Sequence, residues 1–272
     1  MTERVEWDEL PSDLRNAVEA RTGQVEASES VATGFNCSLA MVLDTRGSGR
    51  LFLKGVRVSD SSGMAGLLCE ERINGAVRGI SATIRHRFEL SGWLVLTFTH
   101  IDGRHVDYSP GTADLGAVTH VLRRTQSLRA PAFPVPQLSD RFAGHLKPGE
   151  ADVLHGTHLL HTDTNPHNML IPNHDGHACL VDWAMPALGP AWVDAAYTAR
   201  WLMRFGQTPE DALAWLSGVP SWQQAHRKAV ETFVRVTCRQ AIAQVGERGS
   251  ATSNTQFRHL LDTPAPRPSR QP

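Results

Sequence analysis

Strand-forming patterns are concentrated in the first third of the chain, and helix-forming patterns fill most of the remainder. Four short apolar runs predict two β-hairpins, each closed by a turn that contains glycine: 38–43 with 51–56, and 88–90 with 93–98. Apolar residues recur at helical spacing in 61–77 and in 114–127. This segregation predicts an α+β fold with two lobes, a small antiparallel sheet in one and mainly helices in the other.

The same patterns give provisional boundaries for the lobes. We expect an N-terminal lobe at 1–98, a linker at 99–103 and a helical lobe at 104–245. The tail at 246–272, which is rich in Ser, Thr, Pro and Arg, is expected to be poorly ordered apart from a helix at 256–261. Residues 8–25 and 151–159 are also expected to be helical. Inside the helical lobe, the apolar runs 169–171 and 178–181 predict one small hairpin.

The bulk composition is that of a soluble globular protein. Of the 272 residues, 41% are apolar and 20% are charged, and the net charge of -1 provides no field to attract nucleic acid or a membrane surface. The sequence shows no signal-peptide pattern and no apolar run near the ~20 residues that span a bilayer. We therefore expect a cytoplasmic protein without nucleic-acid or membrane partners. Nothing in the composition favours one oligomeric state.

The cysteines do not indicate a disulfide-linked or zinc-binding fold. The cysteines are widely separated and form no C-x-x-C pair: Cys37, Cys69, Cys179 and Cys238. A disulfide framework or a cysteine-based zinc site is therefore not expected, and free thiols are.

The segment 160–183 carries oxygen-bearing side chains at a spacing that suits phosphoryl transfer. It reads H-T-D-T-N-P-H-N from His161 to Asn168, and Asp182 closes the second strand of the small hairpin. Phosphoryl transfer needs a carboxylate at the acceptor hydroxyl and oxygen ligands for Mg²⁺. The spacing matches the kinase catalytic loop H-x-D-x-x-x-x-N and the metal-binding aspartate that follows it. We predict Asp163 as the base, with Asn168 and Asp182 holding one or two Mg²⁺ ions.

These motifs resemble the aminoglycoside phosphotransferase family, a group of protein-kinase-like enzymes that includes choline kinases. His161-Thr162-Asp163 stands where that family has His-Gly-Asp, and Asp182-Trp183 is similar to the antibiotic-kinase form of Asp-Phe-Gly. Gly189-Pro190 and Asp194-Ala195-Ala196 resemble its G-P-x-x-D-x-A segment. The resemblance implies a kinase that uses ATP as co-substrate and a small-molecule hydroxyl as acceptor. It also implies structural roles for His161, in holding the loop, and for Asp194, in bonding the loop amides.

The resemblance extends to a lysine in the first lobe. Lys54 ends an apolar strand, as the phosphate-contacting lysine does in the V-A-I-K motif of kinases. Such a lysine needs an acidic partner to fix its position. Glu70 fits best, because the family places this glutamate in E-x-x-V-N and Ile73 takes the apolar position, although Glu71 remains an alternative.

The nucleotide-binding elements depart from the kinase pattern at one point. No G-x-G-x-x-G loop is present, and the segment 33–38 takes its place, where backbone amides with Asn36 or Ser38 would cover the phosphates. The segment 97–103 resembles the family's interlobe linker. By that resemblance, the backbone of Thr99 and Ile101 would bond the adenine edge, with Phe98 behind it.

The acceptor is expected to be a small molecule rather than a peptide. There is no Ala-Pro-Glu segment after Asp182, and little room for an activation segment before Gly189. The acceptor site should be built by the helices after Val193 and by the loop 105–136. A cationic antibiotic would need acidic residues there, and the candidates are Asp107, Asp114, Glu210 and Asp211. Aminoglycosides, other antibiotics, amino alcohols and sugars stay open as acceptors, as does GTP in place of ATP, and antibiotic phosphorylation is an analogy at family level.

Two other functions are compatible with parts of the sequence. The altered phosphate loop would also suit a catalytically silent kinase-like binding module. The histidines that precede the hairpin, His155, His158, His161 and His167, raise the alternative of a metallohydrolase. Their spacing fits no standard zinc signature.

Overall fold

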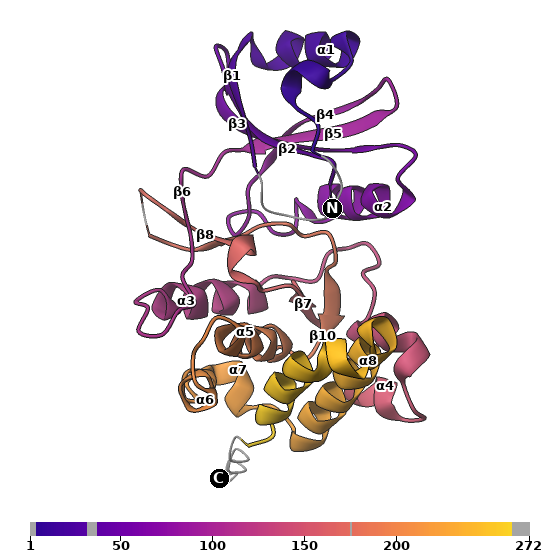
Figure 1. Ribbon diagram of the computed structural model, residues 1–272, viewed down its shortest axis with the longest axis vertical. Helices are drawn as coiled ribbons and strands as arrows, with labels where there is room; N and C mark the ends of the chain where they lie inside the picture. The colour runs from indigo at the N-terminus through magenta and orange to yellow at the C-terminus, as the bar shows by residue number, and fades with distance from the viewer. Residues whose placement is uncertain (1–3, 32–36, 175, 263–272) are drawn as a thin grey trace. The chain divides into compact units, whose positions relative to one another are not determined.

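The computed structural model of the chain describes residues 4–31, 37–174 and 176–262 (Figure 1). The chain divides into two compact units. The first unit runs to Arg104 and also contains Leu170–Met185, and the second contains His105–Met169 and the residues from Pro186 onward. The expected linker at 99–103 adjoins this division. The hairpin region 170–185, which we expected within the helical lobe, belongs instead to the first unit.

The first unit is built on a five-stranded antiparallel sheet of order β1-β2-β3-β5-β4. Its strands are β1 (Val25–Ser30), β2 (Leu39–Thr45), β3 (Gly49–Arg57), β4 (Ile84–Leu90) and β5 (Trp93–Thr99). The pairs β2–β3 and β4–β5 are the two hairpins that the sequence predicts. Ser91 and Gly92 close the second with φ of 53° and 77°, the left-handed pair that matches the twist of a tight hairpin.

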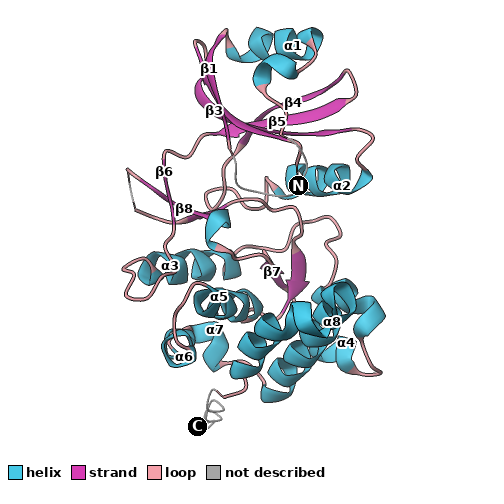
Figure 2. Cartoon of the chain, in the orientation of Figure 1, coloured by secondary structure: helices cyan, strands magenta, loops and turns pink. Residues whose placement is uncertain are grey.

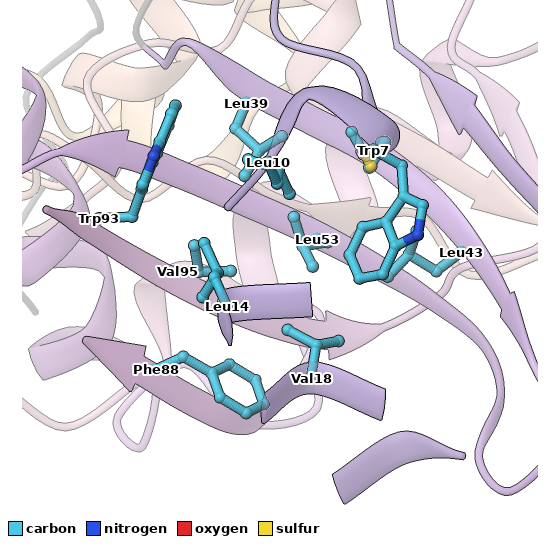
Figure 3. Packing of buried hydrophobic residues seen from close by; sticks show 11 residues of the cluster. Trp7, Leu10, Leu14, Val18, Leu39, Leu43, Leu53, Phe88, Trp93 and Val95 are labelled. Atoms are coloured by element: carbon cyan, nitrogen blue, oxygen red, sulfur yellow. The ribbon is translucent and has the colours of Figure 1, made fainter. Parts of the chain in front are cut away.

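Each face of this sheet is covered by a different helix. Residues of η1 (Trp7–Glu9) and α1 (Ser12–Thr22) pack with Leu53, Val95 and their neighbours in one buried cluster (Figure 3). Residues of α2 (Ser61–Ile73) pack with Val56 and Leu96 in another. Because side chains alternate along a strand, Lys54 lies on the same face as Val56, the face covered by α2.

The start of α2 is capped by Asp60, whose carboxylate accepts a hydrogen bond of 3.0 Å from the backbone N–H of Gly63. Removing this cap with Asp60→Ala should lower the free energy of unfolding by about 1 kcal/mol, because it leaves a helix-end amide without its acceptor. Urea denaturation measures the change. Ser59→Ala, at the exposed neighbouring position, should leave stability within about 0.5 kcal/mol. Equal losses in both variants would contradict the capping role.

A smaller three-stranded sheet of order β6-β8-β9 contains β6 (Gly103–His105), β8 (Met169–Pro172) and β9 (Cys179–Leu180). The strands β8 and β9 are the small hairpin that the sequence predicts. Position 103 requires glycine, because a Cβ atom there would collide with the carbonyl oxygen of Ile171. Close backbone approach therefore fixes where β6 runs beside β8.

The second unit is mainly helical (Figure 2). Its helices are α3 (Leu115–Gln126), η2 (Leu138–His145), α4 (Glu150–Val153), η3 (Pro166–Asn168), α5 (Val193–Arg204), α6 (Pro209–Ser217), α7 (Pro220–Gln223) and α8 (Arg227–His259). Two short strands, β7 (His158–Leu160) and β10 (Ala187–Gly189), pair antiparallel. Phe233 of α8 anchors the core, with its ring edge-on to those of Trp192 and Tyr197. No helix in the described part of the chain is both long and apolar enough to cross a membrane.

Two expectations for this unit were wrong. The helix expected at 151–159 ends at Val153, and β7 begins at His158. Gly156 packs so closely against the backbone of Gly189 that a Cβ atom would not fit, and this contact carries the chain into the β7–β10 pair.

The second correction concerns the expected poorly ordered tail. The helix α8 continues past 246 to His259, turning at Gly246, whose φ is 74°. The continuation is ordered by burial, because Phe257 is only 4% exposed and packs against Phe233. The polar composition of this stretch indicated disorder, but one buried aromatic residue, Phe257, anchors it. Residues 263–272 lie outside the described residues.

Candidate functional site

A buried charged cluster in the first unit joins a strand, a helix and the hairpin region. The Nζ atom of Lys54 on β3 lies 2.6 Å from Oε2 of Glu70 on α2. It also lies 2.6 Å from Oδ1 of Asp182, which follows β9. Burial alone would lower the pKa of Lys54, but the two carboxylates outweigh that effect and raise it, so the ammonium group stays charged. The cluster holds a lysine cation in a fixed position between two anions.

The structure shows which of the two candidate glutamates pairs with Lys54. Glu71, the next residue along α2, pairs with Arg87 on β4, with 3.1 Å between Oε1 and Nε. Neighbouring helix residues point about 100° apart, so Glu70 and Glu71 face different surroundings. Glu70, only 6% exposed, is the partner of Lys54, and Glu71 belongs to a half-exposed ion pair.

The backbone at Asp182 is unusual. Its φ is +63°, in the left-handed region that residues other than glycine occupy only rarely. The next residue, Trp183, is buried, and its indole N–H donates a 2.8 Å hydrogen bond to the carbonyl oxygen of Leu180. Such backbone conformations occur most often at functional sites, where the surrounding structure holds them in place. The hydrogen bond of the buried indole therefore holds the backbone next to Asp182, and the ion pair with Lys54 holds the Asp182 carboxylate.

The loop between β7 and η3 in the second unit holds Asp163 in a defined orientation. One carboxylate oxygen of Asp163 accepts a 2.9 Å hydrogen bond from the amide of Asn165. The other accepts one of 3.2 Å from the amide nitrogen of Asn168, which also donates to the Asp163 carbonyl at 3.0 Å. Because its amide nitrogen is used in this way, Asn168 turns its amide oxygen away from Asp163. A carboxylate and an amide oxygen are thus presented side by side.

Buried hydrogen bonds anchor this loop to the start of α5. The carboxylate of Asp194, at the start of α5, accepts hydrogen bonds from the backbone N–H groups of His161 at 2.8 Å and Thr162 at 2.9 Å. Burial raises the pKa of Asp194, and these amides oppose the rise. The ring Nδ1 of His161 accepts a hydrogen bond of 3.3 Å from the Asp163 amide. Asp194 and His161 therefore hold the loop through its backbone amides.

Asp194→Asn should lower the free energy of unfolding by about 1–3 kcal/mol, because the side chain then offers one acceptor oxygen to two buried amides. Urea denaturation measures this loss. Asp152→Asn makes the same change at an exposed position of α4 and should have an effect below about 0.5 kcal/mol. If the two variants are equally stable, Asp194 does not anchor the loop.

Three residues that sequence reasoning missed also hold the loop. Asn165 orients Asp163, the guanidinium of Arg141 donates to the Thr162 hydroxyl, and the buried Tyr108 hydroxyl donates to the Thr164 carbonyl at 3.0 Å. Asn165 lies within the motif and was visible there as a second amide. The other two come from segments distant in sequence and left no local signal.

The residues expected to bind nucleotide in the first unit are only partly available for that purpose. The backbone N–H of Thr99 already donates to the Thr83 carbonyl at 2.8 Å, so adenine would meet the Thr99 carbonyl instead. Phe98 is buried, as a residue behind the base would be. Ile101 and Ser38 are half-buried. Asn36 lies outside the described residues.

The acidic residues considered for a cationic acceptor mostly support their own backbone. Asp114 accepts a 2.8 Å hydrogen bond from the Asp107 amide, and Asp107 accepts one of 2.8 Å from the Ser109 amide. Asp211 pairs with Thr208 at the start of α6. Glu210 is exposed beside it. Three of these four carboxylates therefore already have local structural partners.

The histidines considered for a metal site do not form one in the described residues. No group of three or more His, Cys, Asp or Glu side chains comes together there in a way that would hold a metal ion. His105 and His167 are in ring contact, with centroids 5.6 Å apart. Burial lowers the pKa of His105, and His167 lowers it further.

Part of the chain matches a known protein family in sequence. Residues 109–227, which include the Asp163 loop and Asp194, match the phosphotransferase enzyme family. No curated protein matches the chain in sequence.

Solved structures share the fold across nearly the whole chain. An amicoumacin kinase, solved with AMP-PNP, Ca²⁺ and amicoumacin, is 13% identical, covers 95% of this chain and 96% of its own, and gives a TM-score of 0.59. A macrolide 2'-phosphotransferase from Brachybacterium faecium is 14% identical, with coverage of 97% and 100% and a TM-score of 0.54. A choline/ethanolamine kinase family protein from Mesorhizobium loti is 13% identical, with coverage of 92% and 96% and a TM-score of 0.55. At these identities the likeness shows the fold, which is that of protein-kinase-like enzymes.

Proposed function

We propose that this small-molecule kinase, whose residues 109–227 match the phosphotransferase enzyme family, transfers the γ-phosphoryl group of ATP or GTP to a hydroxyl group of a small acceptor. The observation that carries the proposal is the pairing of the Asp163 carboxylate with the Asn168 amide on a loop anchored by Asp194. Phosphoryl transfer is accelerated mainly by positioning and by neutralising charge, and a rigid pair of oxygen donors suits both.

Asp163 would act on the acceptor. Its carboxylate accepts the hydroxyl proton as the acceptor oxygen bonds to the γ-phosphorus, and the bond from that phosphorus to the nucleoside diphosphate breaks. The amides of Asn165 and Asn168 hold the carboxylate in one orientation, so little order must be gained when the acceptor arrives. The half-buried position of Asp163 leaves the carboxylate accessible.

Asn168 and Asp182 would hold Mg²⁺. Both offer hard oxygen donors, the kind that magnesium prefers, and the Asn168 amide is oriented with its oxygen as the unused end. A bound Mg²⁺ would offset the negative charge of the phosphates. Both side chains are fixed by other residues, Asn168 by Asp163 and Asp182 by its backbone and by Lys54. The donor chemistry therefore fits the ion.

Lys54 would contact the α- and β-phosphates while Glu70 holds it in place. The carbonyl of Thr99 and the amide of Ile101 would recognise the adenine edge. Ser38 would lie by the phosphates. Without nucleotide, the Lys54 ammonium pairs with both Glu70 and Asp182. These assignments therefore require that the phosphates of ATP compete with Asp182 for the ammonium group.

A nucleotide and acceptor screen tests the proposed function. Thermal shift with Mg²⁺ and either ATP or GTP should raise the melting temperature, because a ligand that binds only the folded state stabilises it. Mass spectrometry should then find one acceptor that gains a phosphate, in a panel of aminoglycosides, macrolides, amino alcohols, sugars and hydroxy acids. Nucleotide binding without turnover across the panel would instead favour the silent binding module.

Glu70→Gln should lower kcat/KM for ATP by about tenfold or more, because a neutral amide holds the lysine less firmly and misplacement of a phosphate contact is costly. Glu71→Gln is the matched control, since it makes the same change one residue away. Steady-state kinetics at saturating acceptor should find Glu71→Gln within about twofold of wild type. Equal losses in the two variants would remove Glu70 from its proposed role.

A further inference from the structure

The residue before the proposed base has a backbone conformation that its own side chain disfavours. Among the described residues other than glycine, φ is positive at Ser91, Thr162 and Asp182, and of these only Thr162 is β-branched. Its φ is 69°, in the left-handed region where a branched side chain crowds the backbone. A strained residue of this kind persists only where surrounding contacts hold it.

Two contacts hold Thr162 in this conformation, one at its backbone and one at its side chain. Its N–H group donates to the Asp194 carboxylate at 2.9 Å, and its hydroxyl accepts a hydrogen bond from the guanidinium of Arg141. Thr162 is only 5% exposed, so water is poorly placed to replace either partner. A glycine at this position would adopt the same φ without strain and would not need the side-chain contact.

Arg141 is itself fixed in position by α8. Its carbonyl oxygen accepts a 2.8 Å hydrogen bond from the side-chain amide of Gln240. The next residue, Phe142, is buried and lies edge-on to Phe233, with ring centroids 6.4 Å apart. Because its backbone is held by a long helix, Arg141 can restrain the residue that its guanidinium contacts.

The charge of Arg141 supports the same arrangement. Burial raises the pKa of Asp194, and Arg141 is among the groups that oppose this rise. The cation therefore favours the ionised form of the carboxylate that accepts from the Thr162 backbone. Arg141 thus acts on Thr162 directly, through the hydroxyl, and indirectly, through Asp194.

The conformation of Thr162 decides where Asp163 points. The peptide that joins the two residues is planar, so a rotation about the backbone of Thr162 turns Asp163 with it. Such a rotation would also disturb the 3.3 Å hydrogen bond from the Asp163 N–H to the ring Nδ1 of His161. Misplacement of a catalytic group by about 1 Å can lower a rate by about 10²-fold. The position of the carboxylate therefore depends on the contacts of the residue before it.

We propose that Arg141 is a positioning residue for phosphoryl transfer, because its hydrogen bond to the Thr162 hydroxyl holds the left-handed backbone that directs the Asp163 carboxylate. The inference rests on the proposed function, since it takes Asp163 as the base. It goes further by making turnover depend on Arg141 only while residue 162 is strained. With glycine at 162, the loop keeps its shape and Arg141 is no longer needed.

Two substitutions at Thr162 separate the hydroxyl contact from the filling of space. Thr162→Val keeps the branched shape and removes the hydroxyl, so kcat should fall by about tenfold or more. Thr162→Gly also removes the hydroxyl but relieves the strain, so kcat should stay within about threefold of wild type. A threonine that only filled space would give the opposite order, because valine fits its site and glycine leaves a gap.

Arg141 variants test the dependence itself. Arg141→Met should lower kcat by about tenfold or more, while KM for the nucleotide changes by less than about twofold. In the Thr162→Gly background, the same substitution should lower kcat by less than about threefold, because the contact it removes is already absent. Arg248→Met, at an exposed position of α8, should retain wild-type kinetics. If Arg141→Met fails to fold, the comparison of Thr162→Val with Thr162→Gly carries the test.

Hydrogen exchange of the loop amides gives a readout that does not need turnover. Exchange in the peptide 158–168 is followed by mass spectrometry with the full chain and no nucleotide. It should be at least about tenfold faster in Arg141→Met and in Thr162→Val than in wild type, because the loop opens more often once the contact is lost. In Thr162→Gly it should stay within about threefold of wild type, with or without Arg141.

Three results would overturn the inference: unchanged kcat or unchanged exchange in Arg141→Met, equal losses from that substitution in the two backgrounds, or a larger loss of kcat in Thr162→Gly than in Thr162→Val. Phosphate transfer by wild type with undiminished kcat in Arg141→Met overturns the inference while the proposed function stands. Faster exchange in the variants, without transfer by wild type to any acceptor, leaves the contact that holds the loop in place and counts against the kinase reaction.

Discussion

Asp163→Asn is expected to lower kcat for phosphate transfer by about 10²–10⁴-fold while nucleotide affinity changes by less than about twofold. The substitution keeps the size of the side chain and an acceptor for one of its amide partners, Asn165 or Asn168. It removes the group that takes the acceptor proton. Because the loop is anchored by Asp194 rather than by Asp163, the fold of the loop should survive.

The measurement for this variant combines steady-state kinetics with nucleotide titration. Asp152→Asn, which makes the same change at an exposed position, should retain wild-type kinetics. A melting temperature close to that of wild type shows that lost activity is not lost structure. Wild-type turnover in Asp163→Asn would remove the residue from the reaction, and an equal loss in nucleotide affinity would assign it to binding instead.

Lys54→Met should lower the free energy of unfolding by about 3–5 kcal/mol, because it removes the cation that pairs with the buried Glu70 and with Asp182. Lys54 and Glu70 are 7% and 6% exposed, so water cannot replace the lost partner at low cost. Urea denaturation measures the loss. Lys228→Met, at an exposed position of α8, should change stability by less than about 0.5 kcal/mol.

The double variant Lys54→Met, Glu70→Leu separates the two contributions. Replacing both buried charges with apolar side chains of similar size is often neutral, so most of the lost stability should return. Nucleotide binding should not return, because the phosphate contact is absent. If the double variant is as unstable as Lys54→Met alone, loss of the lysine cation beside Glu70 is not the cause of the lower stability.

In the wild type, the stability that the Lys54 charge contributes should not depend on pH in the neutral range. The pKa of Lys54 is raised in the folded state, so the stability it contributes is fully present below its ordinary value of 10.5 and is lost only as pH rises through the higher folded value. The free energy of unfolding of the wild type should therefore show no step due to the Lys54 charge between about pH 6 and 9.

Sequence patterns were sufficient for elements stabilised by near neighbours. The hairpins β2–β3 and β4–β5 follow from alternating apolar residues and glycine turns, and α2 begins at a capping aspartate. The strand β1 escaped notice because it reads V-E-A-S-E-S and most of it is exposed at the edge of the sheet. The strands β7 and β10 are too short to show a period, and their pairing depends on Gly156 and Gly189 meeting across a long sequence separation.

The candidate site shows the same difference between features that depend on near neighbours and features that depend on distant parts of the chain. The loop of Asp163 and Asn168 and the choice of Glu70 over Glu71 could be argued from motif spacing, because each motif is local. The anchoring of Thr162 by Arg141 could not be, because it depends on the packing of segments that are distant in the chain. Residues that look acidic and available in sequence, such as Asp114, prove to be engaged by backbone amides.

Transfer of isotope-labelled phosphate tests the central claim most directly. The wild-type chain and Asp163→Asn would be incubated with Mg²⁺, the acceptor panel and ATP whose terminal non-bridging oxygens are ¹⁸O, and the products weighed by mass spectrometry. The account predicts an acceptor that gains the labelled phosphoryl group with wild type and gains almost none with Asp163→Asn. Label recovered only as inorganic phosphate, or equal labelling of the acceptor by the two proteins, would contradict it.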